Sequence, residues 1–246
     1  MKKLGIGCLS ILGIFLVLGI IGFIAANKPL PEGTEGPKAD ALAQQMLVKL
    51  NKPAWDSLNY VSWTFADRQH YIWDKQGNDA VISWGDIKVV MDLDEVTGTA
   101  FDSGTAVTDE NIKQKLISAA WANWCNDSFW LYAPFKVFDK GTTRSIVETD
   151  KAYKALLVSY EGGGVTPGDS YLWLLDNNGM PQAYQMWVGM LPIGGIHVDW
   201  EDWTTLEGGA MIAQNHLIAG KMNVALTNIK SGQSITDLGL DSNPFQ

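Results

Sequence analysis

Cysteine and arginine are scarce in this chain of 246 residues, and their scarcity excludes several classes of site. The two cysteines are Cys8 and Cys125, and Cys8 lies inside an apolar N-terminal run, so no intrachain disulfide is expected. Stability must therefore come from core packing. Arginine, whose planar guanidinium suits phosphate groups, occurs only as Arg68 and Arg144. A dedicated phosphate-binding site is not expected.

Positive charge is also in short supply. The formal net charge of the chain is −9, and Lys2 and Lys3 precede the apolar run, so the rest of the chain carries −11. A surface this acidic repels nucleic acid and anionic headgroups over most of its area. We therefore expect no nucleic-acid partner.

Signatures of common enzymes are missing. The sequence has no G-x-S-x-G, S-x-x-K, H-E-x-x-H or C-x-x-C pattern. The glycine-rich stretch 161–169 lacks the Lys-Ser/Thr pair of a phosphate loop and is typical of a hairpin connection. Asp92, Asp94 and Glu95 resemble part of a calcium loop, but Thr97 stands where that loop needs glycine. No cofactor or metal is expected.

One polar cluster keeps a catalytic or metal-binding alternative open. His197, Asp199 and Glu201 would project from the same face of a strand, and such a trio could bind a metal. Apolar residues alternate with them, however, which is the ordinary pattern of a half-buried strand. His70 and His216 have no visible partner in the sequence and are interpreted as structural or solvated.

The N-terminal run predicts a membrane anchor. It extends from Leu4 to Ala26 without a charge, and a bilayer core of roughly 30 Å needs about 20 apolar residues in a helix. A cleaved signal peptide is the alternative, but neither Phe23 nor Ile24 is the small residue that a cleavage site needs. Lipid modification of Cys8 does not fit, because most of the run follows it.

Charge predicts the orientation of this anchor. Lys2 and Lys3 precede the run and Glu32 and Glu35 follow it, so the positive-inside rule leaves the N-terminus in the cytoplasm. The rest of the chain is then extracytoplasmic, which in a bacterium means periplasmic. Residues 27–37 hold three prolines and two glycines and are interpreted as a short, stiff linker.

Two amphipathic helices are expected after the linker. The first covers 39–50, where Leu42, Met46 and Leu50 form one stripe. The second begins at a cap on Thr108 and ends near 125–127. Its apolar stripe consists of Ile112, Leu116, Ala120 and Trp124.

Alternation of apolar and polar residues with period two predicts a series of short strands. They are expected at 60–65, 70–73, 81–84, 87–93, 155–160, 170–175, 182–188 and 196–204, with aromatic-rich strands at 129–132 and 135–138. The sequence Asp-Asn-Asn-Gly at 176–179 is a strong turn signal. Residues 229–246 are interpreted as a polar tail, ordered only in part.

These elements predict one domain over 38–228, of the mainly β (α+β) class. A long antiparallel sheet curls, so we expect an extended, unclosed sheet whose concave face is covered by the two helices. The chain has eleven tryptophans. Tryptophan buries a large area and has one donor to satisfy, so most of these side chains are expected in the core.

Several stretches carry a resemblance to a known family. They are Phe-Trp-Leu-Tyr-Ala-Pro-Phe-Lys at 129–136, Asp-Lys-Gly at 139–141, 160–169 with Tyr-Leu-Trp at 171–173, the 176–179 turn, Trp187, and Leu-Pro-Ile-Gly-Gly at 191–195. Over roughly 55–217 the chain resembles uncharacterised bacterial proteins related to the outer-membrane lipoprotein carriers, the LolA-like superfamily.

The resemblance implies an unclosed antiparallel barrel lidded by helices, with acyl chains bound between sheet and lid. Two features depart from the carriers. They are free shuttles, whereas this chain is expected to be tethered, and neither Arg68 nor Arg144 matches the arginine of their gating lid. Holding or transferring a lipid near the membrane therefore fits this chain better than shuttling lipoproteins.

We expect a non-catalytic domain that binds a lipid or lipid-modified ligand in an apolar cavity and contacts the membrane through its N-terminal helix. The candidate cavity residues are Trp63, Phe65, Trp84, Leu116, Trp124, Trp173, Trp187 and Trp200. A fully packed structural or protein-interaction domain is the first alternative. An enzyme or metal site at His197, Asp199 and Glu201 is the second. The sequence identifies no protein partner.

Overall fold

The computed structural model describes residues 27–149, 154–162 and 168–246. The apolar run expected to form the anchor therefore lies outside the described residues. Within the described ranges, no helix is both long enough and apolar enough to cross a bilayer.

The strands of the described chain form one antiparallel sheet of fourteen strands, in the order β1-β8-β9-β10-β11-β12-β13-β14-β2-β3-β4-β5-β6-β7. Their bounds are β1 Thr34–Glu35, β2 Tyr60–Phe65, β3 Gln69–Asp74, β4 Asp79–Trp84, β5 Ile87–Asp92, β6 Thr97–Asp102, β7 Thr105–Ala106, β8 Thr142–Val147, β9 Lys154–Tyr160, β10 Ser170–Leu175, β11 Pro181–Trp187, β12 Ile196–Thr205, β13 Met211–Ile218 and β14 Met222–Gly232. The end strands β1 and β7 do not pair with each other, so the sheet is unclosed. The predicted mainly β fold with one large unclosed sheet is confirmed.

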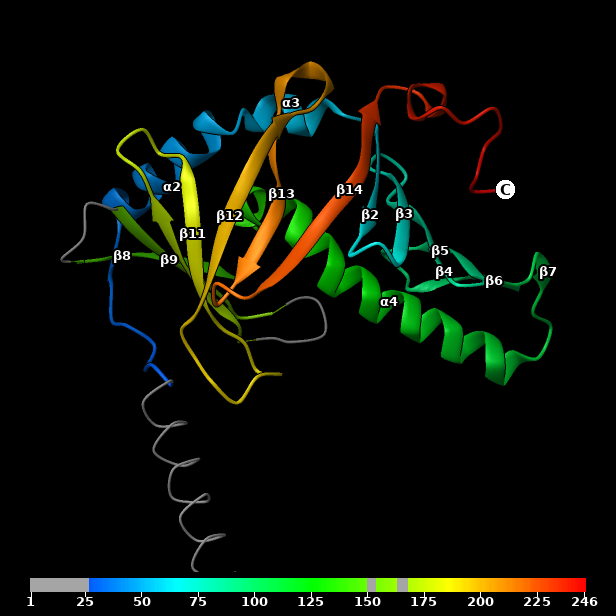
Figure 1. The fold of residues 1–246 in the computed structure, drawn as a ribbon, viewed down its shortest axis with the longest axis horizontal. Helices are drawn as coiled ribbons and strands as arrows, with labels where there is room; N and C mark the ends of the chain where they lie inside the picture. Colours follow the sequence, from blue (N-terminus) through cyan, green and yellow to red (C-terminus); the bar gives the residue numbers. More distant parts are fainter. Residues whose placement is uncertain (1–26, 150–153, 163–167) are drawn as a thin grey trace, which may run out of the picture.

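The sheet has two halves that β14 joins. Strands β8 to β13 form one half and β2 to β7 form the other, and they lie on opposite sides of β14 (Figure 1). On one edge β14 pairs with β13, and on the other it pairs with β2 from Leu226↔Phe65 to Gly232↔Tyr60. The last long strand of the chain, β14, is thus hydrogen-bonded to the first long strand, β2.

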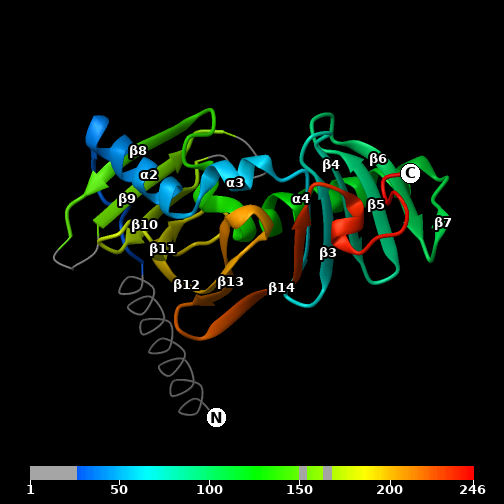
Figure 2. The ribbon, with the colours of Figure 1, turned by 90° about the horizontal axis from the view of Figure 1, so that it is seen from above.

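Helix α4 (Glu110–Tyr132) spans both halves of the sheet (Figures 1 and 2). Helices α2 (Pro37–Lys49) and α3 (Lys52–Ser57) lie along one edge, with α2 next to β8 and β9. Three short 3₁₀ helices, Ala133–Lys136, Glu207–Gly209 and Ile235–Leu238, complete the described elements.

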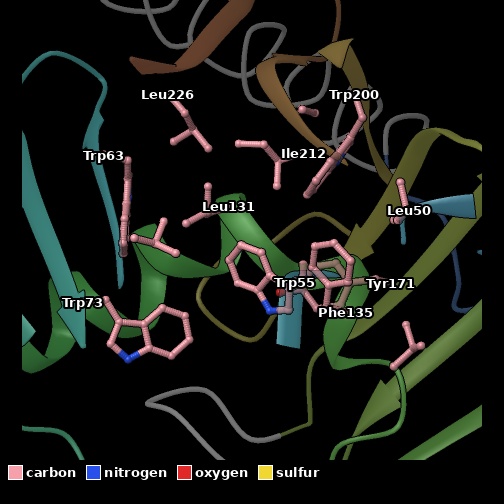
Figure 3. Packing of buried hydrophobic residues seen from close by; sticks show 14 of the residues in the cluster. Leu50, Trp55, Trp63, Trp73, Leu131, Phe135, Tyr171, Trp200, Ile212 and Leu226 are labelled. Carbon is pink, nitrogen blue, oxygen red and sulfur yellow. The ribbon is translucent and has the colours of Figure 1, made fainter. Parts of the chain in front are cut away.

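The main core gathers around α4. Figure 3 shows Trp63 and Trp73 from one half of the sheet and Trp200 and Ile212 from the other, on either side of Leu131 on the helix. A second, smaller apolar cluster consists of Ala155, Leu157, Leu172, Leu174 and Ala183. Strand β10 contributes alternate residues to the two clusters, which explains why its sequence is apolar on both faces.

The second helix differs from the sequence prediction at both ends. Its N-cap is Asp109, whose Oδ1 accepts a hydrogen bond from the Ile112 backbone N–H, and not Thr108. The helix also continues to Tyr132, so the strand expected at 129–132 is wrong, and 135–138 falls on a 3₁₀ turn and the residues after it. Aromatic residues favour strands, but here a helical stripe of buried side chains continues past residue 127. Its members are Ile117, Ala120, Trp124, Ser128 and Leu131.

Helix α2 and most of the predicted strands lie within a few residues of their predicted positions, and the turn at 176–179 is confirmed. The Asp176 carboxylate accepts hydrogen bonds from the backbone of Asn178 and Met180 in this turn. Strands β1, β6, β7, β8, β13 and β14 and helix α3 were not predicted, and β1 lies within the stretch interpreted as a linker. The stretch 229–246, expected to be a polar tail, begins inside β14 and continues into a 3₁₀ helix whose Leu238 is buried.

Candidate ligand pocket

A pocket of about 550 Å³ lies between the second half of α4 and the sheet. Its sheet wall comes from the adjacent ends of β9, β10, β11 and β13, and its floor from the connections that leave those strands. The residues that line it on the sheet side include Tyr160, Tyr171, Tyr184, Met186, Val188, Met190, Leu191 and Ile218. The pocket is therefore walled mainly by aromatic and aliphatic side chains.

The helix wall of the pocket follows one face of α4. Ala122, Cys125, Phe129 and Tyr132 recur at three- and four-residue spacing and all line the pocket. Phe129 is held in place by Tyr171 on β10, with ring centroids 4.6 Å apart. Burial raises the pKa of the Cys125 thiol to about 11, which is consistent with an apolar surrounding at this wall.

Polar groups gather at one part of the pocket. The Lys136 amine forms an ion pair with Asp139 at 2.5 Å. Burial alone would lower the pKa of this amine, but the charges of Tyr132 and Asp139 outweigh it and the pKa is raised. Lys140 also lines this part of the pocket.

Tyrosine hydroxyl groups complete the polar part. Burial, together with the neighbouring Asp169, raises the pKa of Tyr171, which hydrogen-bonds that carboxyl group. Asp169 also accepts a hydrogen bond of 2.8 Å from the Gly189 backbone. The Tyr160 hydroxyl is buried and has no hydrogen-bond partner among the described residues. A buried hydroxyl without a partner is costly, so a ligand oxygen that accepted a hydrogen bond from the Tyr160 hydroxyl would be stabilised.

The start of the described chain is fixed beside the pocket. The Lys28 backbone N–H donates to the Gly194 carbonyl at 3.1 Å, and the Asn27 side chain accepts from the Gly194 N–H at 2.8 Å. The Trp187 indole donates to the Lys28 carbonyl at 2.8 Å. A Cβ atom on Gly194 would overlap Trp187, so the close approach needs glycine at this position. These contacts place the N-terminal segment on the connection between β11 and β12.

The residues predicted from sequence to line a cavity lie in different parts of the structure. Trp124 lines the pocket. Trp63, Phe65, Trp173 and Trp200 belong to the packed core and are at most 7% exposed. Trp173 packs edge-on against Trp200, with 4.9 Å between ring centroids.

The other three predicted residues lie apart from the pocket. Trp84 and Leu116 are partly buried against the main core. Trp187 packs against the second cluster and binds Lys28. Sequence reasoning thus selected large aromatic residues that mostly belong to the packed core, and it missed lining residues such as Phe129, Tyr160 and Leu191.

The polar cluster on β12 does not form a comparable site. His197 Nε2 lies 2.8 Å from Asp199 Oδ1, and both side chains are more than one-third exposed. Neither residue lines the pocket between α4 and the sheet. Within the described ranges, no group of three His, Cys, Asp or Glu side chains is arranged to hold a metal ion. The metal alternative therefore has no support from this cluster.

Comparison with known proteins does not assign the chain to a family. No family model matches it, and no curated protein matches its sequence.

Proposed function

We propose that this protein is a membrane-tethered, extracytoplasmic domain that binds a lipid or an acylated ligand, without catalysis, in the pocket between α4 and the sheet. The observation that carries the proposal is the pocket itself, with its aromatic and aliphatic lining and its one polar part. The resemblance of the sequence to the LolA-like superfamily supports it, since that family binds acyl chains between sheet and helices.

The size of the pocket favours one acyl chain. A methylene group is about as large as a water molecule, whose share of liquid volume is about 30 Å³. A pocket of about 550 Å³ thus has room for roughly 18 such groups. Each buried methylene contributes about 0.8 kcal/mol, so an apolar chain alone provides ample binding free energy before ordering costs.

The polar part of the pocket gives the ligand a direction. The Tyr160 hydroxyl needs an acceptor, and the amines of Lys136 and Lys140 favour an oxygen-rich group near it. We therefore place the carboxyl, ester or phosphate end of the ligand near Tyr160, and its hydrocarbon chain along Phe129 and Met186.

The test is native mass spectrometry of residues 27–246 purified without detergent, followed by solvent extraction. We expect adducts of lipid mass in the natural sequence. Replacing Ala122→Trp fills the helix wall of the pocket and should remove at least about nine-tenths of the adduct, which corresponds to about 1.4 kcal/mol. Ala119→Trp is the matched control, because Ala119 is exposed on α4 one turn outside the pocket lining.

Cys125 supplies a second measurement of the same site. It is the one cysteine of the fragment 27–246 and it lines the pocket, so a bound acyl chain should slow its alkylation. We expect added fatty acid or lysophospholipid to protect Cys125 in the Ala119→Trp variant and not in the Ala122→Trp variant. A clean apo mass, together with alkylation that no lipid slows, contradicts the proposal and leaves the packed interaction domain as the better account.

A further inference from the structure

We infer that the connection between β11 and β12 is a membrane-contacting lip, through which the pocket faces the bilayer surface. The lip is defined as residues 188–193, Val-Gly-Met-Leu-Pro-Ile. The inference rests on the proposed function and on the membrane anchor expected from the sequence. It goes beyond them by identifying the place where the ligand enters the pocket.

The lip is apolar and exposed. Met190 is 66% exposed and Leu191 is 39% exposed, and both also line the pocket. Pro192, also in the lip, is exposed as well. No charged residue occurs from Gln185 to Ile196 in a chain of which 18% is charged. Exposed apolar groups that adjoin one another in this way mark a contact surface.

The chain's own N-terminal segment argues for a bilayer as the occupant. Asn27 and Lys28 are bound to Gly194, directly after the lip. The 26 residues before them contain the uncharged run from Leu4 to Ala26. A span that ends at Asn27 therefore holds the lip within a few residues of the membrane surface, whatever the tilt of the domain.

Positive side chains lie near the lip. Lys28 lies against Gly195, directly after the lip. In the turn between β13 and β14, which follows the pocket residue Ile218, the Ala219 N–H donates to the His197 carbonyl at 2.8 Å and the exposed Lys221 and Met222 follow. A juxtamembrane lysine contributes about 1 kcal/mol to binding of an anionic surface. In a domain of charge −11, lysines and apolar groups are thus combined at the edge where the chain enters the domain.

Other strongly exposed apolar residues lack this combination. Val48 is 76% exposed on α2, at the edge of the sheet opposite the lip (Figure 1). Ile112 is 52% exposed near the start of α4 and does not line the pocket. Single exposed apolar residues are ordinary on protein surfaces, so Val48 serves as a matched control.

The experiment uses the full chain in vesicles made of equal parts phosphatidylcholine and phosphatidylglycerol. Pro192 is replaced by the photo-reactive residue p-benzoylphenylalanine, and Val48 is replaced in a parallel sample. Pro192 does not line the pocket, so adducts at this position report the bilayer and not a pocket ligand. We expect about tenfold more lipid adduct at Pro192 than at Val48, as for a preference of about 1.4 kcal/mol.

A second variant tests whether the apolar lip causes the contact. Adding Met190→Ser and Leu191→Ser to the Pro192 probe should reduce its lipid adduct several-fold, with the circular dichroism spectrum unchanged. Equal lipid adduct at Pro192 and Val48 overturns the inference, and so does crosslinking of Pro192 to a second copy of the chain. Because ligand in the pocket is measured separately by solvent extraction, an empty pocket with a lipid-bound lip would refute the proposed function alone.

Discussion

His216 shows how the packed interior controls a single titratable group. The side chain is fully buried, and its Nδ1 lies 3.1 Å from the Val224 carbonyl, so this nitrogen carries the proton and donates. Trp200 covers the ring edge-on at 4.4 Å between centroids. The other ring nitrogen of His216, Nε2, has no hydrogen-bond partner among the described residues. Burial lowers the pKa of His216 to about 4, so the folded protein keeps the ring neutral at neutral pH.

Stability should therefore fall in mild acid through this residue. Below the ordinary histidine pKa of about 6.5, His216 is protonated in the unfolded chain but stays neutral in the folded chain. The loss begins near pH 6.5 and is complete near pH 4, where it reaches about 3 kcal/mol. Urea unfolding at pH 7 and near pH 4 measures it, and in the His216→Phe variant the loss of stability between the two pH values should be smaller by about 3 kcal/mol.

The same comparison separates His216 from Asp127. Burial raises the pKa of the Asp127 carboxyl, so this group takes up a proton in the folded state first and favours folding as the pH falls. Since Asp127 is present in both proteins, its contribution cancels in the difference. An identical loss of stability in the His216→Phe variant would contradict the assignment.

The environment of a single residue could not be read from the sequence. His216 was interpreted as structural or solvated, and its complete burial follows from Trp130 and Trp200, which approach it from α4 and β12. Nothing local to position 216 signals two aromatic neighbours so distant in the chain. The pocket residues Phe129 and Tyr160 share this difficulty, because their common surroundings arise only when α4 is folded across the sheet.

At the scale of elements, α4 is attached to the sheet by a buried polar contact. The Tyr71 hydroxyl on β3 donates to Asp127 Oδ2 at 2.5 Å, and the Asn126 amide donates to Oδ1 at 2.7 Å. Tyr71 also stacks on Trp63 with 4.7 Å between ring centroids. This contact fixes the rotation of α4 and, with it, which face of the helix lines the pocket.

Removing the hydroxyl should destabilise the fold. Tyr71→Phe leaves a buried carboxyl with one partner fewer, which costs about 1–3 kcal/mol. In a double-mutant cycle with Asp127→Leu the losses should be less than additive, by at least about 0.5 kcal/mol. Lys52→Ala, which breaks the exposed Lys52–Asp56 ion pair, is the control and should cost under about 1 kcal/mol. Fully additive losses would show that the contact does not couple α4 to β3.

The two helices differ in how far their sequences determine them. In α2, Leu42 and Met46 repeat at helical spacing and this pattern predicts the helix, although Pro37, its first residue, was interpreted as part of the linker. In α4, residues after 127 are aromatic and favour strands by propensity. Packing of Leu131 against both halves of the sheet overrides that preference, and no local pattern reports it (Figure 3).

For the whole molecule, the continuity of the sheet depends on β14. Leu226 on this strand is 1% exposed and pairs with Phe65 on β2. Figure 3 shows the Leu226 side chain facing the space between the two halves of the sheet, near Leu131. The two halves therefore share one core, and we expect them to unfold together.

Truncation of this side chain should destabilise both halves equally. Leu226→Ala is expected to cost about 2–5 kcal/mol, while Met222→Ala, on the same strand but 58% exposed, should change stability by less than about 0.5 kcal/mol. Tryptophan fluorescence and far-UV circular dichroism should give one coincident transition in each case. Two separated transitions for Leu226→Ala would show that the halves are independent units.

The overall class of the fold was predictable because period-two alternation is strong in strands such as β2 and β5. The full number of strands was not. In β8 and β14, polar or charged residues such as Arg144 and Lys230 interrupt the pattern, and both strands are recognisable only from their partners. Arg144 is stabilised there by an ion pair with Asp40 on α2, 104 positions away in the sequence.

The pairing of β14 with β2 also governs the order in which the chain can fold. Tyr60 pairs with Gly232, so almost the whole domain lies between the two partners, and contacts so distant in sequence form slowly. A chain synthesised from its N-terminus presents β2 as an open strand edge until β14 has been made. Such edges recruit other chains, so the chain is most prone to aggregation in the interval just before β14 becomes available to pair with β2.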